Sequence, residues 1–527
     1  SGEEKADFEF IQKFDDWFAG IRDNYLNGVK VFINSPKLTI SVFAGIVLFT
    51  SVMFVLIPKG FLPTEDKGAV FAQIQLPDGS SASRTNIVAN EVEERILKIP
   101  GVENTITLVG FSGENTALIV AELSNWSKRK SKDLSMQTIL GKIKTEFANY
   151  PSATIAAFSP PSISGLGMFG GFEYQLLDKG DRTPQELYEE AQKLIQAGNK
   201  NSAFQMVYTS FTANLPQLMI KVDENKALAQ GVNISEIYNA LSGYFGKSYV
   251  NDFNKYGRVY RVYLQADSDY REKPSDIDKI YVKSNSGTMV PLSAVVNVSN
   301  IVGPYSLTRF NMYPAITING QARSGVSSGQ AMSAMEAISD EILPKDMGYA
   351  WSGSSLQEKE SAGQIGPILA MSLVFIYLFL VGLYESWMLP IAVLLISPVA
   401  LVGALFFQYV SGQSLDLYSQ IGLVMLIGLS TKQAILIIEF AKDAHEKGMG
   451  IIESAMQAAK LRFRAVMMTN IAFILGLLPL VFAKGAGAAS RNSVGMTVFG
   501  GMMAVAFIGT FLVPAFFVLI EDLKVYT

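Results

Sequence analysis

A lysine in the middle of an apolar segment is the feature that most constrains this sequence. Lys432 lies within residues 418–441 (YSQIGLVMLIGLSTKQAILIIEFA), a run long enough to span a bilayer. An ammonium ion at that depth is costly unless a counter-charge or water accompanies it. None of the apolar runs carries Asp or Glu near its centre, and Glu439 lies close to the end of its own run. The sequence therefore holds one half of an intramembrane ion pair. We expect the carboxylate to come from another chain or from a part of the protein outside this sequence.

Composition excludes several classes of protein. The chain has 527 residues, 49% of them hydrophobic and 17% charged, which is too long for one soluble domain and too charged for membrane throughout. The net charge of −4 argues against a nucleic-acid partner. There is no Cys and a single His, His445, so most metal, redox and Ser-His-Asp sites are excluded, and we predict no catalytic residue, metal or cofactor. No GxxxxGK[ST] motif occurs, so ATP is not the expected energy source.

Six apolar runs are long enough to cross a membrane. They are residues 38–57, 364–383, 388–410, 418–441, 465–483 and 494–520. The connector 442–464 carries five Lys or Arg against three Asp or Glu, so the positive-inside rule predicts that it is cytoplasmic. Counting spans from there puts both ends of the sequence in the cytoplasm and residues 59–363 outside it. The acidic, polar start (SGEEKADFEF) differs from a signal peptide and is typical of the middle of a longer protein.

The segment before the first span and the long external segment both show periodic patterns. Residues 8–32 have apolar side chains at helical spacing, which fits an amphipathic helix on the membrane surface and a soluble linker helix equally well. The external segment predicts strand, helix, two strands, helix and strand over 69–76, 82–98, 102–109, 116–123, 134–150 and 153–159. This β-α-β-β-α-β order is that of a ferredoxin-like module. A second copy is predicted over 172–177, 183–195, 205–210, 315–319, 327–343 and 348–353.

These patterns predict an α+β membrane protein. Its six transmembrane helices accompany a large external domain of two ferredoxin-like β-α-β-β-α-β modules and an inserted subdomain with a strand at 258–265 and a turn-forming tip, NKYG, at 254–257. The predicted divisions are a linker helix at 1–37, the first transmembrane helix at 38–58, module 1 at 59–170, module 2 at 171–213 and 313–363, the insertion at 214–312, five transmembrane helices at 364–521 and a cytoplasmic tail at 522–527.

Several short sequences, in order and on matching topology, carry a family resemblance. They are GFLPTEDKG at 60–68, YVNDF at 249–253, YESW at 384–387, GLSTKQAILIIEFAKD at 428–443, GAG at 485–487 and the Gly pair at 500–501. With them the chain resembles the C-terminal half of a resistance-nodulation-division (RND) transporter of the hydrophobe/amphiphile efflux family, and the match covers nearly the whole chain.

The resemblance implies a secondary active transporter, a proton antiporter rather than an enzyme. Its protomer has two such halves, lies in membrane lipid and assembles as a homotrimer in the Gram-negative inner membrane. The external modules become periplasmic porter modules and the insertion a docking subdomain. A periplasmic adaptor protein and an outer-membrane channel complete the pump, which exports drugs and other hydrophobic or amphiphilic compounds. The N-terminal half supplies paired aspartates, which would be the partners of Lys432. Two alternatives stay open, an RND transporter for metal ions or lipids and a non-transporting RND-derived scaffold or receptor.

The resemblance also assigns a proton relay to Lys432, Thr469 and Arg462. Mid-span placement of Lys432 supports this assignment, and the alternative is a lysine that lines a cavity. For Thr469 the alternative is a hydroxyl bonded to its own helix backbone, and for Arg462 it is a charge that anchors the cytoplasmic end of its span.

Candidate substrate contacts come from three places in module 1. Residues 156–170 (AAFSPPSISGLGMFG) combine Phe and Met with Gly, which suits a promiscuous apolar pocket, although ordinary core is an equal alternative. Residues 109–115 (VGFSGEN) resemble the family's switch loop in a shortened form, and Val120 stands where the family often has Phe. The candidates are Phe158, Leu166, Met168, Phe169, Phe111 and Val120.

Overall fold

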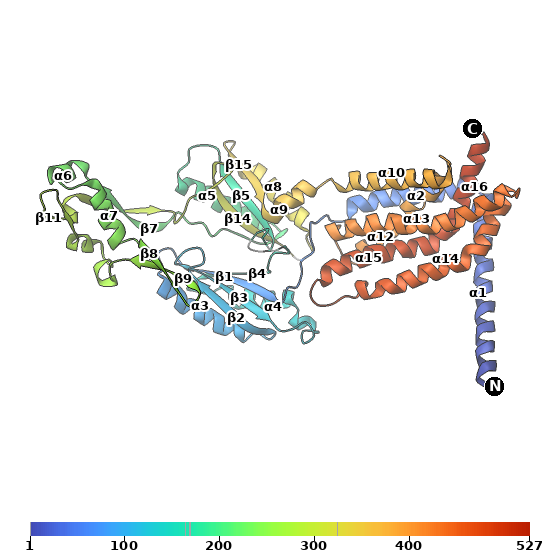
Figure 1. Cartoon of the computed structure of the whole chain (residues 1–527), viewed down its shortest axis with the longest axis horizontal. Coiled ribbons are helices and arrows are strands. Elements are labelled where there is room, and N and C mark those ends of the chain that lie inside the picture. Colours follow the sequence, from blue (N-terminus) through green and yellow to red (C-terminus); the bar gives the residue numbers. More distant parts are fainter. Residues whose placement is uncertain (1, 164, 168–169, 324, 527) are drawn as a thin grey trace. The chain divides into compact units, whose positions relative to one another are not determined.

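The computed structural model describes residues 2–526 except 164, 168, 169 and 324 (Figure 1). The chain divides into two compact units. The first contains the residues up to Asp181, Glu189–Ser210 and the chain from Thr308 onward, and the second contains Arg182–Tyr188 and Phe211–Leu307.

Six helices of the first unit are long and apolar enough to cross a membrane, within the part of the chain that the structure describes. They are Pro36–Leu56 (α2), Ile365–Tyr384 (α10), Leu389–Val410 (α11 and α12), Leu417–Glu446 (α13), Ile451–Val481 (α14) and Ala488–Lys524 (α15, η5 and α16). Each overlaps one of the predicted apolar runs, so the prediction of six helices long and apolar enough to cross a membrane is confirmed.

Two details of these helices differ from the prediction. The connector 442–464 is mostly helix, because α13 continues to Glu446 and α14 begins at Ile451. The charges of the connector bear on which side of the membrane it lies, but they do not end a helix. The helices end instead around Gly448 and Gly450, which lie between them. The third span is also broken, into Leu389–Leu394 (α11) and Ser397–Val410 (α12). Pro398 explains the break, since proline has no N–H and its ring clashes with the carbonyl of the residue four positions earlier.

The sixth span changes its helical geometry part-way. Ala488–Ala504 (α15) passes through a π-helical turn at Val505–Gly509 (η5) into Thr510–Tyr526 (α16). The hydroxyl of Thr510 donates to the carbonyls of Val505, at 3.2 Å, and Ala506, at 2.9 Å. A side chain thus satisfies carbonyls where the regular ladder is interrupted.

The predicted N-terminal helix is one long helix, Gly2–Asn34 (α1). Its residues Tyr25, Val29 and Ile33 are buried in the same core as the membrane helices. The ring of Tyr25 stacks on Phe463 of α14 at 4.4 Å between centroids. This helix is therefore packed along part of its length against the bundle.

Module 1 contains a four-stranded antiparallel sheet. Its elements are Ala69–Gln75 (β1), Ala82–Leu97 (α3), Val102–Val109 (β2), Thr116–Leu123 (β3), Met136–Glu146 (α4) and Thr154–Phe158 (β4). The strand order is β2-β3-β1-β4. Both helices cover one face, where alternate strand residues such as Ala72, Ile74, Ile119 and Ala121 pack against them. The predicted strands and helices of this module are confirmed to within a few residues.

Module 2 repeats that arrangement. Its elements are Phe172–Asp178 (β5), Pro184–Lys200 (α5), Phe204–Tyr208 (β6), Thr308–Phe310 (β13), Tyr313–Ala322 (β14), Ser328–Ile342 (α8), Met347–Ser352 (β15) and Gly353–Ser361 (α9). The strand β14 pairs with β5, which pairs with β15, while β6 and β13 pair with the other edge of β14. The chain reaches β14 from β6 only after passing through the second unit.

The second unit has its own core around Ile237, Ile277 and Leu292. It contains Leu215–Val222 (β7), Glu224–Ala229 (α6), Ile234–Tyr244 (α7), Ser248–Lys255 (β8), Arg258–Leu264 (β9), Tyr281–Lys283 (β10), Met289–Pro291 (β11) and Val296–Gly303 (β12), with short 3₁₀ turns between some of them. The predicted strand and tip are confirmed, because β8 and β9 form a hairpin in which Lys255 pairs with Arg258. Tyr256 and Gly257 close the hairpin with φ of 53° and 71°. Positive φ at both central residues is what a two-residue type I′ turn requires.

Glycines bring α12 and α15 into close contact. A Cβ on Gly500 would lie 2.6 Å from Cβ of Phe407 and 2.7 Å from the carbonyl oxygen of Gly403. Small residues let membrane helices approach to backbone contact, which strengthens dispersion between them.

We therefore expect Gly500→Ala to destabilise the helical bundle by about 1–3 kcal/mol, because the helices must separate to admit the methyl group. The measurement is the melting temperature of the purified protein in detergent. Gly428→Ala on α13 is the matched control, since nothing lies within 4 Å of its added Cβ. Equal melting temperatures for the two variants would contradict the packing argument.

Candidate functional site

A buried amide pair fixes the register of α13 against α14. The side-chain amide of Gln433 donates to the side-chain carbonyl of Asn470, and these residues are 5% and 0% exposed. Lys432 and Thr469 each precede one member of this pair in the sequence. The pair therefore holds Lys432 and Thr469 at the same level on adjoining helices, as a common relay requires.

Lys432 itself faces away from the packed core. It is exposed, and its ammonium group has no hydrogen bond or ion pair among the side chains that the structure describes. Its neighbours on α13, Thr431 and Gln433, are buried. The helix thus presents a cation on its open face in the middle of a membrane span, and the next exposed charge on that face, Glu439, lies about two turns farther along.

Thr469 and Arg462 lie on the same side of α14, two helical turns apart. The Thr469 hydroxyl donates to the backbone carbonyls of Ala465, at 3.0 Å, and Val466, at 2.9 Å. The guanidinium carbon of Arg462 lies 3.4 Å from the ring centroid of Phe440 on α13, and its buried Nε has no hydrogen-bond partner among the described residues. Both side chains are held by their own helix or by α13, and none of these contacts joins them to Lys432.

A buried carboxyl group that sequence reasoning missed lies at the start of α13. Asp416 is 2% exposed and accepts hydrogen bonds from the backbone N–H of Ser419 and from the hydroxyl of Ser493 on α15, both at 2.7 Å. Burial raises its pKa. The Asp416 residue precedes Lys432 by sixteen positions, which is about 24 Å along a helix, so it caps α13 and leaves the lysine unpaired.

Modules 1 and 2 of the first unit enclose a cleft of about 650 Å³. Both modules line it, and so does the loop between α12 and α13 through Ser414. The lining is formed mainly by residues 61–64, 159–163, 170–172, 321–323 and 325–328, together with Glu358. Leu166 and Phe111 are partly buried outside this lining. Met168 and Phe169 lie outside the described residues.

Next to the cleft, an apolar row crosses the face of the module 1 sheet that α3 and α4 leave uncovered. Strand register aligns Val120 with Phe71, and Phe71 with Phe158. Phe158 is 2% exposed and packs against Phe71, with centroids 6.5 Å apart, and against Tyr208 of module 2, at 6.1 Å. The structure therefore brings two of the candidates, Val120 and Phe158, into one row and adds Phe71 and Tyr208.

The Tyr208 hydroxyl is buried and makes no hydrogen bond among the described residues. Burial raises its pKa. Such a group is a costly exception in a protein interior unless something else satisfies it. No periodicity in the sequence marks Tyr208, because its setting depends on the contact between two modules.

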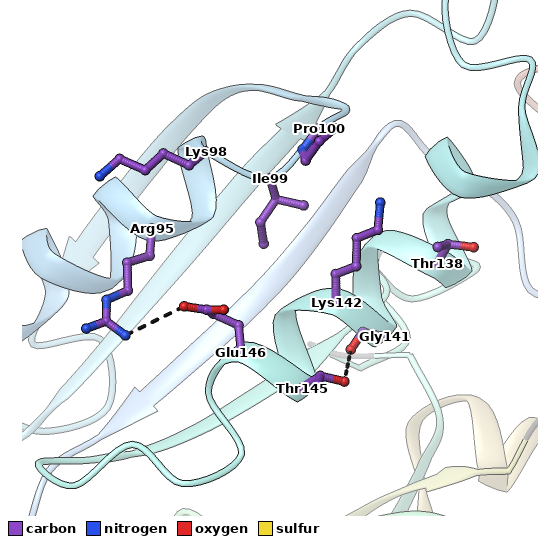
Figure 2. A pocket seen from close by; sticks show the side chains of 9 residues that line it. All are labelled: Arg95, Lys98, Ile99, Pro100, Thr138, Gly141, Lys142, Thr145 and Glu146. Carbon is purple, nitrogen blue, oxygen red and sulfur yellow. Dashed lines mark hydrogen bonds and ion pairs between the residues drawn. The ribbon is translucent and has the colours of Figure 1, made fainter.

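A second hollow, on the helical side of module 1, has a different character (Figure 2). Its lining includes Arg95, Lys98 and Lys142. The guanidinium of Arg95 lies 3.6 Å from the carboxylate of Glu146, and Lys142 donates to the carbonyl of Asp133 at 3.1 Å. The Arg95–Glu146 pair ties α3 to α4 at the surface, and the charged lining makes this hollow a poor place for an apolar molecule.

Comparisons with known proteins agree on one family. The family model described as "AcrB/AcrD/AcrF family" matches residues 1–521. The multidrug export protein AcrF of Escherichia coli K12 is 37% identical over 520 residues, which is 97% of this chain and 50% of that protein. The multidrug/solvent efflux pump membrane transporter MepB of Pseudomonas putida is 37% identical, over 96% of this chain and 49% of its own length. The multidrug resistance protein MdtF of Escherichia coli K12 is 36% identical, over 97% and 50%. The chain spans about half the length of these relatives.

One property of the cleft is independent of these similarities. Glu358 lines the cleft, and Oε1 of its carboxyl group accepts a hydrogen bond from the Ser328 hydroxyl at 2.9 Å. Burial raises the pKa of Glu358 to about 7, against the smaller opposing effects of Ser328 and Lys359. The group therefore changes its charge near neutral pH, inside the cleft.

This shift makes stability depend on pH. Because the folded-state pKa lies above the ordinary value of 4.5, the stabilising contribution of protonated Glu358 is complete below that value and is lost as pH rises through about 7. Between these two pH values the free energy of unfolding should fall by on the order of 3 kcal/mol.

We expect Glu358→Gln to unfold at a higher temperature than the wild type at pH 8 and to lose that advantage at pH 5. Glu360→Gln, at an exposed position on the same helix, should follow the wild type throughout. Parallel pH curves for the wild type and Glu358→Gln would contradict this.

Proposed function

The chain belongs to the AcrB/AcrD/AcrF family, and from that premise we propose that it is the C-terminal half of an RND protomer that exports drugs and other hydrophobic or amphiphilic compounds by proton antiport. The single observation that carries the proposal is the unpartnered ammonium of Lys432 in the middle of α13. A family transporter that uses a proton must hold a titratable carboxylate in the membrane, and this lysine is suited to pair with it. The names of the relatives, which describe multidrug and solvent efflux, support the class of substrate.

The missing carboxylates are proposed to come from the N-terminal half, as paired aspartates facing Lys432. While a carboxylate is ionised, it attracts Lys432 and holds the two halves of the bundle together. Protonation removes that attraction, and the helices repack toward the alternative arrangement. The available drive is about 2.3 kcal/mol per charge for each 100 mV, plus the pH gradient.

Thr469 and Arg462 are proposed as the remaining members of the relay. The amide pair of Gln433 and Asn470 keeps Thr469 level with Lys432, where a hydroxyl can position a proton or water. Arg462 contacts the ring of Phe440 on α13, so it would sense a shift between the two helices.

The external modules are proposed to be ferredoxin-like porter modules. In both, the helices connect strands so that the order in the sheet is second, third, first and fourth. The second compact unit is proposed to be the docking subdomain, inserted into module 2. The proposed assembly is a homotrimer in the inner membrane, with the modules in the periplasm and with an adaptor protein and an outer-membrane channel as partners.

Substrates are proposed to bind along the cleft and the adjoining apolar row. The row supplies aromatic faces with little directional demand, which suits varied apolar molecules, and Tyr208 supplies one unsatisfied hydroxyl. Phe158, Val120, Phe111 and Leu166 remain the proposed contacts from module 1, with Phe71 added by the register of the strands.

The relay predicts that Lys432→Ala abolishes export of every substrate while the protein is made and assembled normally, because the carboxylates lose their counter-charge. The measurement is drug resistance in cells that produce the complete transporter, with protein level checked. Lys442→Ala is the control, since Lys442 lies near the end of the same helix and pairs with Glu446 at 3.6 Å. Normal resistance in a Lys432→Ala strain would exclude Lys432 from the relay.

The apolar row beside the cleft predicts a different result for Phe158→Ala. Losing one ring should cost roughly 1–2 kcal/mol of binding for some drugs and almost nothing for others, so the drug profile should change while proton coupling survives. A panel of chemically unrelated drugs measures this. Phe147→Ala is the control, because Phe147 is 3% exposed in the core on the helical side of the same sheet. A uniform loss in both variants would assign Phe158 to the core.

A further inference from the structure

Two adjacent carboxylates, in the segment between α2 and β1, bind different parts of the first unit. Glu65 accepts hydrogen bonds at Oε1 from the backbone N–H of Ser490, at 2.7 Å, and at Oε2 from that of Ala489, at 3.3 Å. Both donors lie in the first turn of α15. The helix follows Gly487, which offers no side-chain cap, so Glu65 satisfies helix-end N–H groups from more than 400 positions away in the sequence.

The next residue, Asp66, is bound to module 1. Its carboxylate pairs with both terminal nitrogens of Arg129, at 2.8 Å and 3.1 Å. Burial alone would raise the pKa of Asp66, but Arg129 and the backbone N–H of Gly68 hold it below its usual range. The Arg129 side chain is 2% exposed, and its Nε donates to the carbonyl of Ser124 at 2.6 Å, directly after β3. A bidentate pair of this kind, with its guanidinium buried, holds Asp66 in one geometry.

On the membrane side, α15 is tied to the helix that carries Lys432. The Ser493 hydroxyl donates to Asp416, which caps α13. Farther along, Gly422 and Gly501 leave no room between the two helices, since a Cβ on Gly422 would lie 3.1 Å from Thr497, and one on Gly501 would overlap Leu426. A displacement of the α15 N-terminus is therefore transmitted to α13.

We propose that Glu65 is the positioning residue that couples module 1 to the proton-carrying helices. It acts through α15, and Asp66 with Arg129 anchors it to the module. The inference rests on the proposed function and deepens it by naming the contact through which module 1 is joined to the membrane helices. An ordinary helix cap stabilises only its own helix. Here the capping residue belongs to a segment that Asp66 and Arg129 fix to module 1. Its hydrogen bonds therefore join α15 to module 1, and a movement of one is passed to the other. Contiguous networks of this kind can carry coupling between distant sites.

The test uses the complete transporter in proteoliposomes, with ethidium as the probe substrate. Proton flux is measured with and without ethidium, and ethidium binding is measured separately. Glu65→Gln replaces one acceptor oxygen by a donor that faces backbone N–H groups. We expect it to reduce the stimulation of proton flux by ethidium about 5-fold or more, the usual lower size of an allosteric coupling, while ethidium binding is unchanged. Glu103→Gln is the control, because Glu103 forms an exposed ion pair with Lys128 on the same module.

A covalent replacement of the bond separates coupling from folding. The chain contains no Cys, so the double variant Glu65→Cys with Ala489→Cys places a unique pair in this half, and a short bifunctional thiol reagent can join it. We expect loss of stimulation before cross-linking and recovery after it, with each single-Cys variant unaffected by the reagent. Full stimulation in Glu65→Gln overturns the proposal, as does a loss that cross-linking fails to restore. If the wild type itself shows no proton-linked export, the proposed function fails, a result distinct from a wild type that transports equally well without Glu65.

Discussion

The unpaired charge of Lys432 sets the conditions that the rest of the structure must meet. An ammonium group in the middle of a span requires one open face on α13 and a partner that reaches it. The remaining faces of α13 must then pack tightly against the neighbouring helices, because a loosely packed helix could rotate about its axis and turn the ammonium group toward water. Buried small and polar residues, among them Gly422, Ser430 and Gln433, meet this demand.

Partly buried hydrogen bonds also join the membrane helices to module 1. Lipid tails provide no hydrophobic force between helices, so the bundle depends on close approach and on a few buried hydrogen bonds. Two of these hydrogen bonds lie near the N-termini of α13 and α15. Asp416 joins α13 to α15, and Glu65 joins α15 to the segment between α2 and β1. Each is a carboxylate bound to a helix N-terminus, where backbone N–H groups favour negative charge.

The candidate site was predictable in the membrane and much less so outside it. Lys432 stands out in the sequence because a charge within an apolar run violates a strong local rule. The modules offered no such violation. Phe158 was singled out by the composition of its segment and Val120 by resemblance, and the strand register is what places both beside Phe71. Glu358 and Tyr208 look like ordinary residues in the sequence, and only burial in or near the cleft gives them unusual chemistry.

The sequence by itself determined the six spans, the order of strands and helices in both modules and the hairpin at 254–257, because length, periodicity and turn chemistry act over neighbouring residues. It also predicts that the carboxylate partner of Lys432 comes from outside this sequence. The tertiary structure decided which side chains share a sheet face, which carboxyl groups are buried and which helix Glu65 caps. These properties depend on contacts between residues hundreds of positions apart, as in the bond from Glu65 to Ser490. Local patterns carry no information about such pairings, since packing selects them only after the elements have formed.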